Sequence, residues 1–220
     1  MTVSVQQVVD AQVHIGTLKS EAHPKTRKFW ADIVNNIVVI NPDVIIEQLN
    51  YAKEKIQKAK AEGKDILVVC EKKMYQQELS KLAESSGVFY LNYKIPAGFL
   101  TNFETLKKRI DSMNDMIRFM ESESFLTLTK KEQLTYKRKF DRINRIYKGV
   151  TKLSKRPDLV IVIDGTMLDG FVDELPKHKS IDSVVIATTN FSRYYPKENM
   201  LMANISSYKS LDFVMRYLLS

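Results

Sequence analysis

Short apolar runs alternate with amphipathic stretches over most of the 220-residue chain. Four runs consist mainly of β-branched and other apolar residues: 66–70, 88–90, 159–163 and 183–187. Runs that are apolar on both faces are typical of strands buried in a parallel sheet. Helical patterns occupy most of the intervals: 44–59, 72–86, 168–175 and 211–219. This alternation predicts an α/β fold, in which right-handed crossovers place helices on both faces of a parallel sheet.

The N-terminal part of the chain predicts a small hairpin and a capped helix. Residues 29–33 and 37–40 have the pattern of two strands joined by two asparagines, which tolerate the positive φ of a tight turn. A helix follows, for which Asn41 or Asp43 provides the cap.

Residues 103–155 interrupt the alternation of strands and helices. Their apolar residues step by three and four in two narrow stripes: Phe103, Leu106, Ile110, Met113, Ile117 and Met120, then Tyr136, Phe140, Ile143, Tyr147 and Val150. Narrow stripes on otherwise polar helices are of the coiled-coil type. Between them, Thr129 and Glu132 have the spacing of a capping box.

We therefore predict an antiparallel α-helical hairpin, of the coiled-coil type, over residues 103–155. It would protrude from an α/β domain made of residues 1–102 and 156–220. The alternative is that both helices lie on the sheet, where wider apolar faces would be expected.

Charge is the first indication of function. The formal net charge is +8, and a basic surface favours a polyanion, either nucleic acid or an acidic membrane. The second helix of the predicted hairpin and its continuation are dense in cations: Lys130, Lys131, Lys137, Arg138, Lys139, Arg142, Arg145, Lys148, Lys152, Lys155 and Arg156. The first helix adds fewer: Lys107, Lys108, Arg109 and Arg118. This density favours contacts with nucleic-acid phosphates over an ordinary solvated face.

Residues suited to catalysis or metal binding are sparse. Cys70 is the only cysteine, which excludes an internal disulfide, and its apolar neighbours favour a buried side chain. The histidines lie far apart in the sequence: His14, His23 and His178. The loops at residues 71–74 and 164–166 lack the glycines of a phosphate-binding loop. We expect no catalytic residue, metal, cofactor or small-molecule substrate.

Membrane association is not expected either. No apolar stretch is long enough to cross a bilayer, and the first residues lack the pattern of a signal peptide. We therefore expect the protein to stay in the compartment where it is made.

Several motifs occur in a characteristic order: Val13-His14-Ile15-Gly16, His23-Pro24-Lys25, Lys72-Lys73 after an apolar strand, Leu100-Thr101-Asn102-Phe103, Leu128-Thr129-Lys130-Lys131-Glu132 and Arg156-Pro157-Asp158. In order and spacing, from about Val13 to Leu218, they resemble the bacterial-type small-subunit ribosomal protein S2 family. The chain departs from the family pattern in four places: Lys94–Phe99, Gly165, Thr188–Asn190 and Ser206-Ser207. These departures indicate a divergent member.

The resemblance implies a flavodoxin-like sheet with a protruding helical hairpin, and a structural role without enzymatic activity. The implied partners are small-subunit ribosomal RNA, other small-subunit ribosomal proteins and, in many bacteria, ribosomal protein S1. The implied location is the ribosome, in the cytoplasm or in an organelle. Two other hypotheses stay open: a Rossmann-like nucleotide-binding enzyme with its site at residues 71–74 and 164–166, and a free-standing RNA-binding regulator.

Candidate RNA contacts follow from the resemblance and from the positions of the cations. They are Lys25, Arg27, Lys28, Lys72, Lys73, Gly98, Thr101, Asn102, Lys107, Lys108, Lys130, Lys131, Lys137, Arg138, Arg142 and Arg145. Capping of the hairpin helix is an equal alternative for Asn102. Tyr93, Phe99 and Phe103 are candidates to stack on an unpaired base, although packing under the hairpin is the favoured role of Phe103.

Overall fold

The computed structural model describes residues 3–193 and 196–220. Within these residues, a sheet of five parallel strands forms the centre of the molecule, in the order β5-β4-β6-β7-β8. The strands are β4 (Ile66–Val69), β5 (Phe89–Leu91), β6 (Leu159–Ile163), β7 (Asp182–Ala187) and β8 (Met200–Met202). This is a doubly wound order of the flavodoxin type. The predicted parallel α/β sheet is confirmed, with β8 as an additional edge strand.

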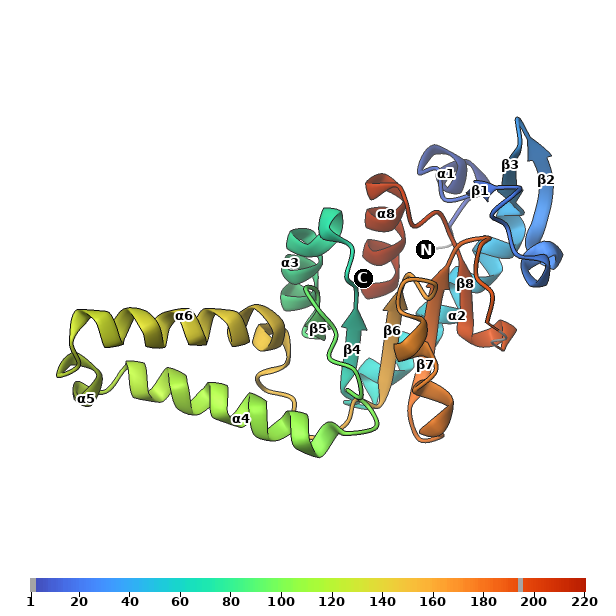
Figure 1. Ribbon diagram of the computed structural model, residues 1–220. Coiled ribbons are helices and arrows are strands. Elements are labelled where there is room, and N and C mark those ends of the chain that lie inside the picture. Colours follow the sequence, from blue (N-terminus) through green and yellow to red (C-terminus); the bar gives the residue numbers. More distant parts are fainter. Residues whose placement is uncertain (1–2, 194–195) are drawn as a thin grey trace.

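Long helices cover one face of this sheet. They are α2 (Pro42–Ala61), α3 (Gln76–Ser86) and α8 (Tyr208–Leu219), and α8 packs against both of the others (Figure 1). The crossovers from β4 to β5 and from β6 to β7 move in opposite directions along the sheet. Right-handed connections therefore place α3 and α7 (Asp169–Val172) on opposite faces. The face of the sheet that carries α7 is also covered by η4 (Leu175–Lys177) and by the segment after β5.

A second, antiparallel sheet lies at one end of the molecule, with α1 (Val5–Asp10) nearby (Figure 1). It has the order β1-β3-β2, formed by β1 (Ile15–Leu18), β2 (Trp30–Val34) and β3 (Ile37–Ile40). The predicted tight turn is confirmed, because Asn35 and Asn36 have φ values of 49° and 63°. The buried Thr189, which follows β7, holds this sheet: its Oγ1 accepts the Thr17 N–H and its carbonyl accepts the His23 N–H, both at 2.8 Å.

Two long helices extend away from the sheet at the other end of the molecule (Figure 1). They are α4 (Phe103–Met120) and α6 (Lys130–Tyr147), with the short α5 (Glu123–Leu126) between them and η3 (Lys148–Val150) after them. We call α4, α5 and α6 the helical arm. Phe119, Phe125 and Tyr136 form an aromatic cluster in the arm, with ring centroids 5.1–5.9 Å apart.

The apolar stripes of α4 and α6 are on the sides that face each other. Met116 is buried in α4, whereas Ile117 and Met120 of the predicted stripe are only half-buried. The buried position moves from residue 117 to residue 116 because an α-helix has 3.6 residues per turn, slightly more than the 3.5 of the predicted spacing. At the start of α6 the predicted capping box is present, and its hydrogen bonds from Thr129 to the Glu132 carboxylate hold the pKa of Glu132 below its ordinary value.

The caps of two other helices were also predicted from the sequence. Asn41 caps α2 by accepting the Asp43 N–H at 2.9 Å. Asn102 occupies the N-cap position of α4, but its side chain makes no capping hydrogen bond. The capping role proposed for the Asn102 side chain is therefore wrong.

The base of the arm meets the sheet at a glycine. A Cβ atom on Gly149 of η3 would collide with the carbonyl oxygen and the ring of Tyr90 in β5. A backbone this close to a strand leaves no room for a side chain.

We expect Gly149→Ala to lower the free energy of unfolding by about 2 kcal/mol, because the Tyr90 carbonyl belongs to the sheet and cannot move aside. Gly170→Ala is the matched control, since a Cβ there meets nothing within 4 Å in α7. It should raise the free energy of unfolding by up to about 1 kcal/mol. Urea denaturation measures both values, and equal effects would show that the close approach does not matter.

Candidate nucleic-acid interface

In the crevice where doubly wound folds bind ligands, an ion pair of the protein itself joins the two strand ends. Such folds bind ligands at the carboxyl ends of the strands where the strand order reverses, which here is between β4 and β6. Lys72 Nζ lies 2.7 Å from the Asp164 carboxylate, and their side chains are only 19% and 9% exposed. Asp164, at a φ of 70°, also accepts the Met167 N–H at 3.0 Å. Gly165 packs against Val185 and Phe191, so it does not form an open phosphate loop.

The thiol next to this crevice is not set up to react. Cys70 is completely buried. Burial raises the pKa of its thiol to about 11, so the nucleophilic thiolate is scarce near neutral pH. The prediction of a buried, hydrophobe-like cysteine is confirmed.

Two carboxylates bind the segment between β5 and α4. Glu71 accepts the Ile95 N–H at 2.7 Å. Glu174, which is 8% exposed, accepts hydrogen bonds from three backbone N–H groups: Gly98 at 2.7 Å, Leu100 at 3.0 Å and Thr101 at 3.2 Å. The Thr101 hydroxyl donates a fourth at 3.4 Å. The polar groups of Gly98 and Thr101 are thus used inside the protein, and this anchor sets where α4 begins.

The same anchor turns two predicted stacking residues inward. Phe99 and Phe103 are buried, and their rings pack edge to face at 5.8 Å. Neither ring can stack on a base, so the candidate stacking role is wrong for Phe99, and for Phe103 the favoured packing role is confirmed. Tyr93 remains accessible, with 42% of its surface exposed.

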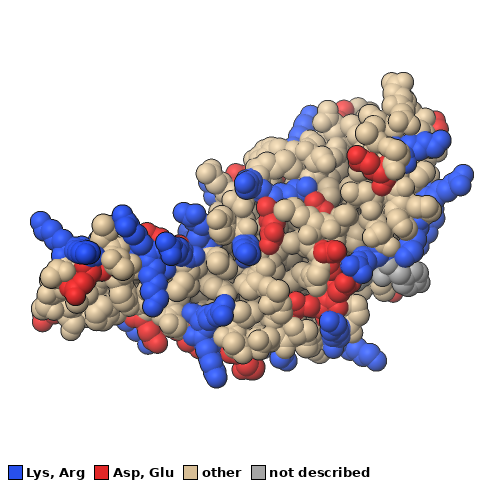
Figure 2. Space-filling view, viewed as in Figure 1, with Lys and Arg blue, Asp and Glu red and all other residues tan. Residues whose placement is uncertain are grey.

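The cations of the arm are distributed unequally between its helices. In α4, Lys107 pairs with Asp111 at 2.9 Å and Arg118 with Asp115 at 3.5 Å. The basic residues of α6 are more numerous: Lys130, Lys131, Lys137, Arg138, Lys139, Arg142 and Arg145. Within residues 3–193 and 196–220, none of these seven forms an ion pair. Uncompensated positive charge therefore gathers on α6, where Figure 2 shows many Lys and Arg side chains.

The exposed side of α6 carries a basic stripe, which we define as Lys131, Arg138, Arg142 and Arg145. Successive members are seven, four and three residues apart, so they lie on one face of the helix. The stripe is about 21 Å long at 1.5 Å per residue.

A second group of predicted contacts lies at the opposite end of the molecule, on η1 (Pro24–Phe29). Lys25, Arg27 and Lys28 are all exposed, but Lys25 donates to the Ser192 carbonyl at 3.0 Å and Lys28 lies over the Phe29 ring. Lys73 is exposed next to the paired Lys72. The structure thus separates the predicted RNA-binding residues into groups and does not gather them in one pocket.

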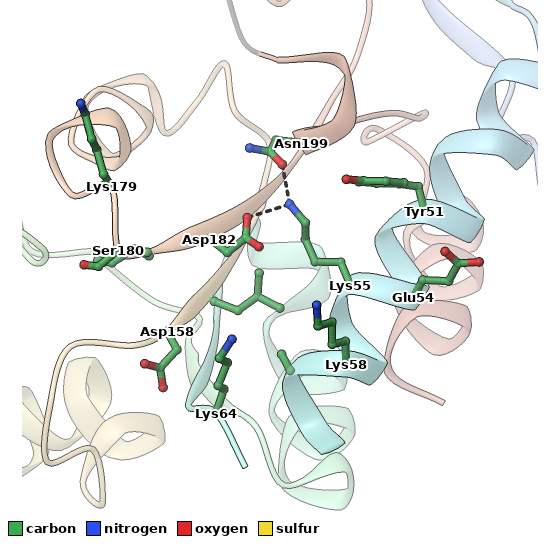
Figure 3. Close-up of a pocket in the computed structure, with 13 residues that line it drawn as sticks. Tyr51, Glu54, Lys55, Lys58, Lys64, Asp158, Lys179, Ser180, Asp182 and Asn199 are labelled. Carbon is green, nitrogen blue, oxygen red and sulfur yellow. Dashed lines mark hydrogen bonds and ion pairs between the residues drawn. The ribbon is translucent and has the colours of Figure 1, made fainter. Parts of the chain in front are cut away.

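The cavity in Figure 3 lies at the amino ends of β6 and β7 and encloses about 640 Å³. Lys55 reaches across it from α2 to the Asp182 carboxylate, at 2.7 Å, and to Asn199. Four lysines line the cavity together with three carboxylates, so positive and negative charges nearly balance there. Its polar groups join α2 to the sheet, and it lacks the excess of cations found on α6.

Residues 3–193 and 196–220 contain neither a metal-binding cluster nor a membrane-spanning helix. There, no three His, Cys, Asp or Glu side chains are grouped so that they could hold a metal ion. No described helix is both long enough and apolar enough to span a bilayer.

Comparison with known sequences indicates a family. The sequence model of the family described as Ribosomal protein S2 matches residues 8–220. The chain is 33% identical over 162 residues to the "Small ribosomal subunit protein uS2" of Helicobacter acinonychis (strain Sheeba), covering 74% of this chain and 66% of that protein. The protein of the same name from Helicobacter pylori (strain Shi470) is also 33% identical over 162 residues, covering 74% of this chain and 61% of that protein.

The "Small ribosomal subunit protein uS2" of Fusobacterium nucleatum subsp. nucleatum is similar to the same degree. It is 32% identical over 176 residues, which cover 79% of this chain and 69% of that protein. The chain spans 61–66% of the length of the two Helicobacter proteins.

Glu174 provides a test of the anchor at the start of the arm. We expect Glu174→Ala to lower the free energy of unfolding by about 3 kcal/mol, because three backbone N–H groups lose their acceptor. Glu54→Ala, at an exposed position of α2, should change it by less than about 0.5 kcal/mol. Urea denaturation gives both values, and a small effect at Glu174 would mean that the segment is held by other contacts.

Proposed function

Because the chain belongs to the ribosomal protein S2 family, we propose that it is a structural protein of the small ribosomal subunit that binds small-subunit ribosomal RNA. In this proposal it is bound to the ribosome, in the cytoplasm or in an organelle. Neighbouring ribosomal proteins, including ribosomal protein S1, are its protein partners. The match over residues 8–220 carries the proposal, and the unpaired cations of α6 support it.

The ion pair in the crevice argues against a nucleotide-binding enzyme. A ligand at the usual site would have to break the Lys72–Asp164 ion pair and leave a charged side chain buried without a counter-ion. The protein acts in assembly, as a scaffold that holds RNA and neighbouring proteins in place.

Residues 103–155 act in this proposal as an inserted coiled-coil hairpin, and residues 1–102 and 156–220 form the α/β domain that carries it. The facing apolar stripes, the aromatic cluster and the anchors at Glu174 and Gly149 support this division. A hairpin fixed at its base presents its basic helix in a constant orientation.

RNA contacts are assigned to the exposed cations, which bind phosphates without reading sequence. They are Lys25, Arg27, Lys28, Lys73, Lys108, Lys130, Lys131, Lys137, Arg138, Arg142 and Arg145. Asn102 is exposed at the start of α4 and joins them. Lys72, Gly98, Thr101 and Lys107 have partners within the protein and position these contacts.

Sedimentation tests the proposal directly. A lysate of the source organism is run through a sucrose gradient and probed with an antibody to this protein. We expect it to migrate with the small subunit in moderate salt, because contacts spread over many phosphates are not released at once. Protein that stays at the top of the gradient would contradict the scaffold and favour a free-standing regulator.

Removing part of the positive charge of α6 tests how much this helix contributes to RNA binding. Replacing Lys137, Arg138, Arg142 and Arg145 by Gln should weaken RNA binding and flatten the slope of log K against log salt by up to about 4. The measurement is fluorescence anisotropy with a small-subunit RNA fragment over a range of salt concentrations.

In the matched control, Gln replaces four exposed lysines of the α/β domain: Lys58, Lys81, Lys177 and Lys179. This control should change the slope much less, although the net charge falls equally. Equal changes in the two variants would mean that net charge, and not the arm, governs binding.

A further inference from the structure

An arginine lies over a tyrosine ring where the arm meets the sheet. The Arg145 guanidinium, in the last turn of α6, lies 5.3 Å from the centre of the Tyr93 ring. Tyr93 is 42% exposed and Arg145 is also exposed, so the pair faces solvent. Fifty-two positions separate the two residues in the chain, and the fold alone brings them together.

The backbone holds both partners firmly. On the tyrosine side, the Asn92 side chain donates to the Gln76 carbonyl and the Ile95 N–H donates to Glu71, both at 2.7 Å. On the arginine side, the next turn is fixed by the buried Tyr147 and by Gly149 against β5. Little backbone conformational entropy therefore remains to be lost when a ligand binds the pair.

A cation–π contact uses the positive charge of the guanidinium and does not use up its N–H groups as hydrogen-bond donors. Within the described residues Arg145 has no acidic partner, so these donors are available to a ligand. A planar fork of this kind matches the oxygens of a phosphate. The pair also lies at the inner end of the basic stripe, where a nucleic-acid strand following the stripe would reach the exposed ring.

We propose that Tyr93 and Arg145 bind one unpaired RNA nucleotide, with its base stacked on the exposed tyrosine ring and its phosphate held by the guanidinium. A base within a helix is already stacked on its neighbours, so an open aromatic ring selects a bulged or single-stranded nucleotide. This inference rests on the proposed RNA-binding function and adds to it a preference for a feature of RNA structure.

Two synthetic RNA stems test the proposal with the full-length protein. One stem carries a single bulged 2-aminopurine, and the other has the same sequence without the bulge. We expect the wild type to prefer the bulged stem and to quench the 2-aminopurine fluorescence as the base stacks. Tyr93→Leu should lose about tenfold in affinity for the bulged stem only, and Tyr93→Phe should keep the preference because it keeps the ring.

Arg145→Lys retains the charge but loses the planar group, so it should also reduce the preference for the bulge. Tyr51→Leu is the matched control, because Tyr51 is 46% exposed and its ring lies under Lys55 at 5.7 Å, away from the arm. This control should behave as the wild type does. Thermal melting of each variant shows that a loss of binding is not a loss of folding.

The outcomes separate this inference from the proposed function. Equal binding of both stems by the wild type, or an unchanged preference in Tyr93→Leu, would overturn the nucleotide site while RNA binding stands. Failure of the wild type to bind either stem would overturn both.

Discussion

The ion pair between Lys72 and Asp164 determines what the carboxyl edge of the sheet can do. It occupies the position where doubly wound folds receive a ligand, and each charge is buried against the other. Either side chain alone would be a buried charge without a counter-ion, so the two must stay together. Beside this ion pair, Glu71 and Glu174 hold the segment between β5 and α4 at the same edge of the sheet. In other doubly wound folds this edge of the sheet usually binds small molecules. In this protein it supports the base of the helical arm.

The arm is attached to the sheet both where the chain enters it and where the chain leaves it. These two attachments connect the sheet to the proposed interface. The chain enters the arm after the Glu174 anchor and leaves it at Gly149, whose backbone lies directly on β5. The arm packs through its aromatic cluster and narrow apolar stripes, so the outer side of α6 makes no contribution to that packing. Its side chains are therefore available for a partner.

The sequence predicted the helices and strands that have a clear local pattern of apolar residues. The dense apolar runs gave β4, β6 and β7, and the stripe spacing gave α4 and α6. The strands β1 and β8 were missed because each is short and its pairing depends on distant residues. The Glu174 anchor was missed for the same reason: the carboxylate meets donors more than 70 positions away. Phe99 was named as a candidate for stacking because nothing local indicates that this anchor turns its ring inward.

The charges of α6 are arranged against the local preferences of a helix. Lys130 and Lys131 occupy its first turn, where the helix dipole disfavours positive charge, and Glu132 is the one acid there. Further along, the cations of the basic stripe repel one another, whereas those of α4 are partly neutralised by acids one turn away. The capping box and the aromatic cluster offset this cost in the free protein. A polyanion alongside α6 would remove it, because phosphates would pair with the α6 cations that have no acidic partner among the described residues.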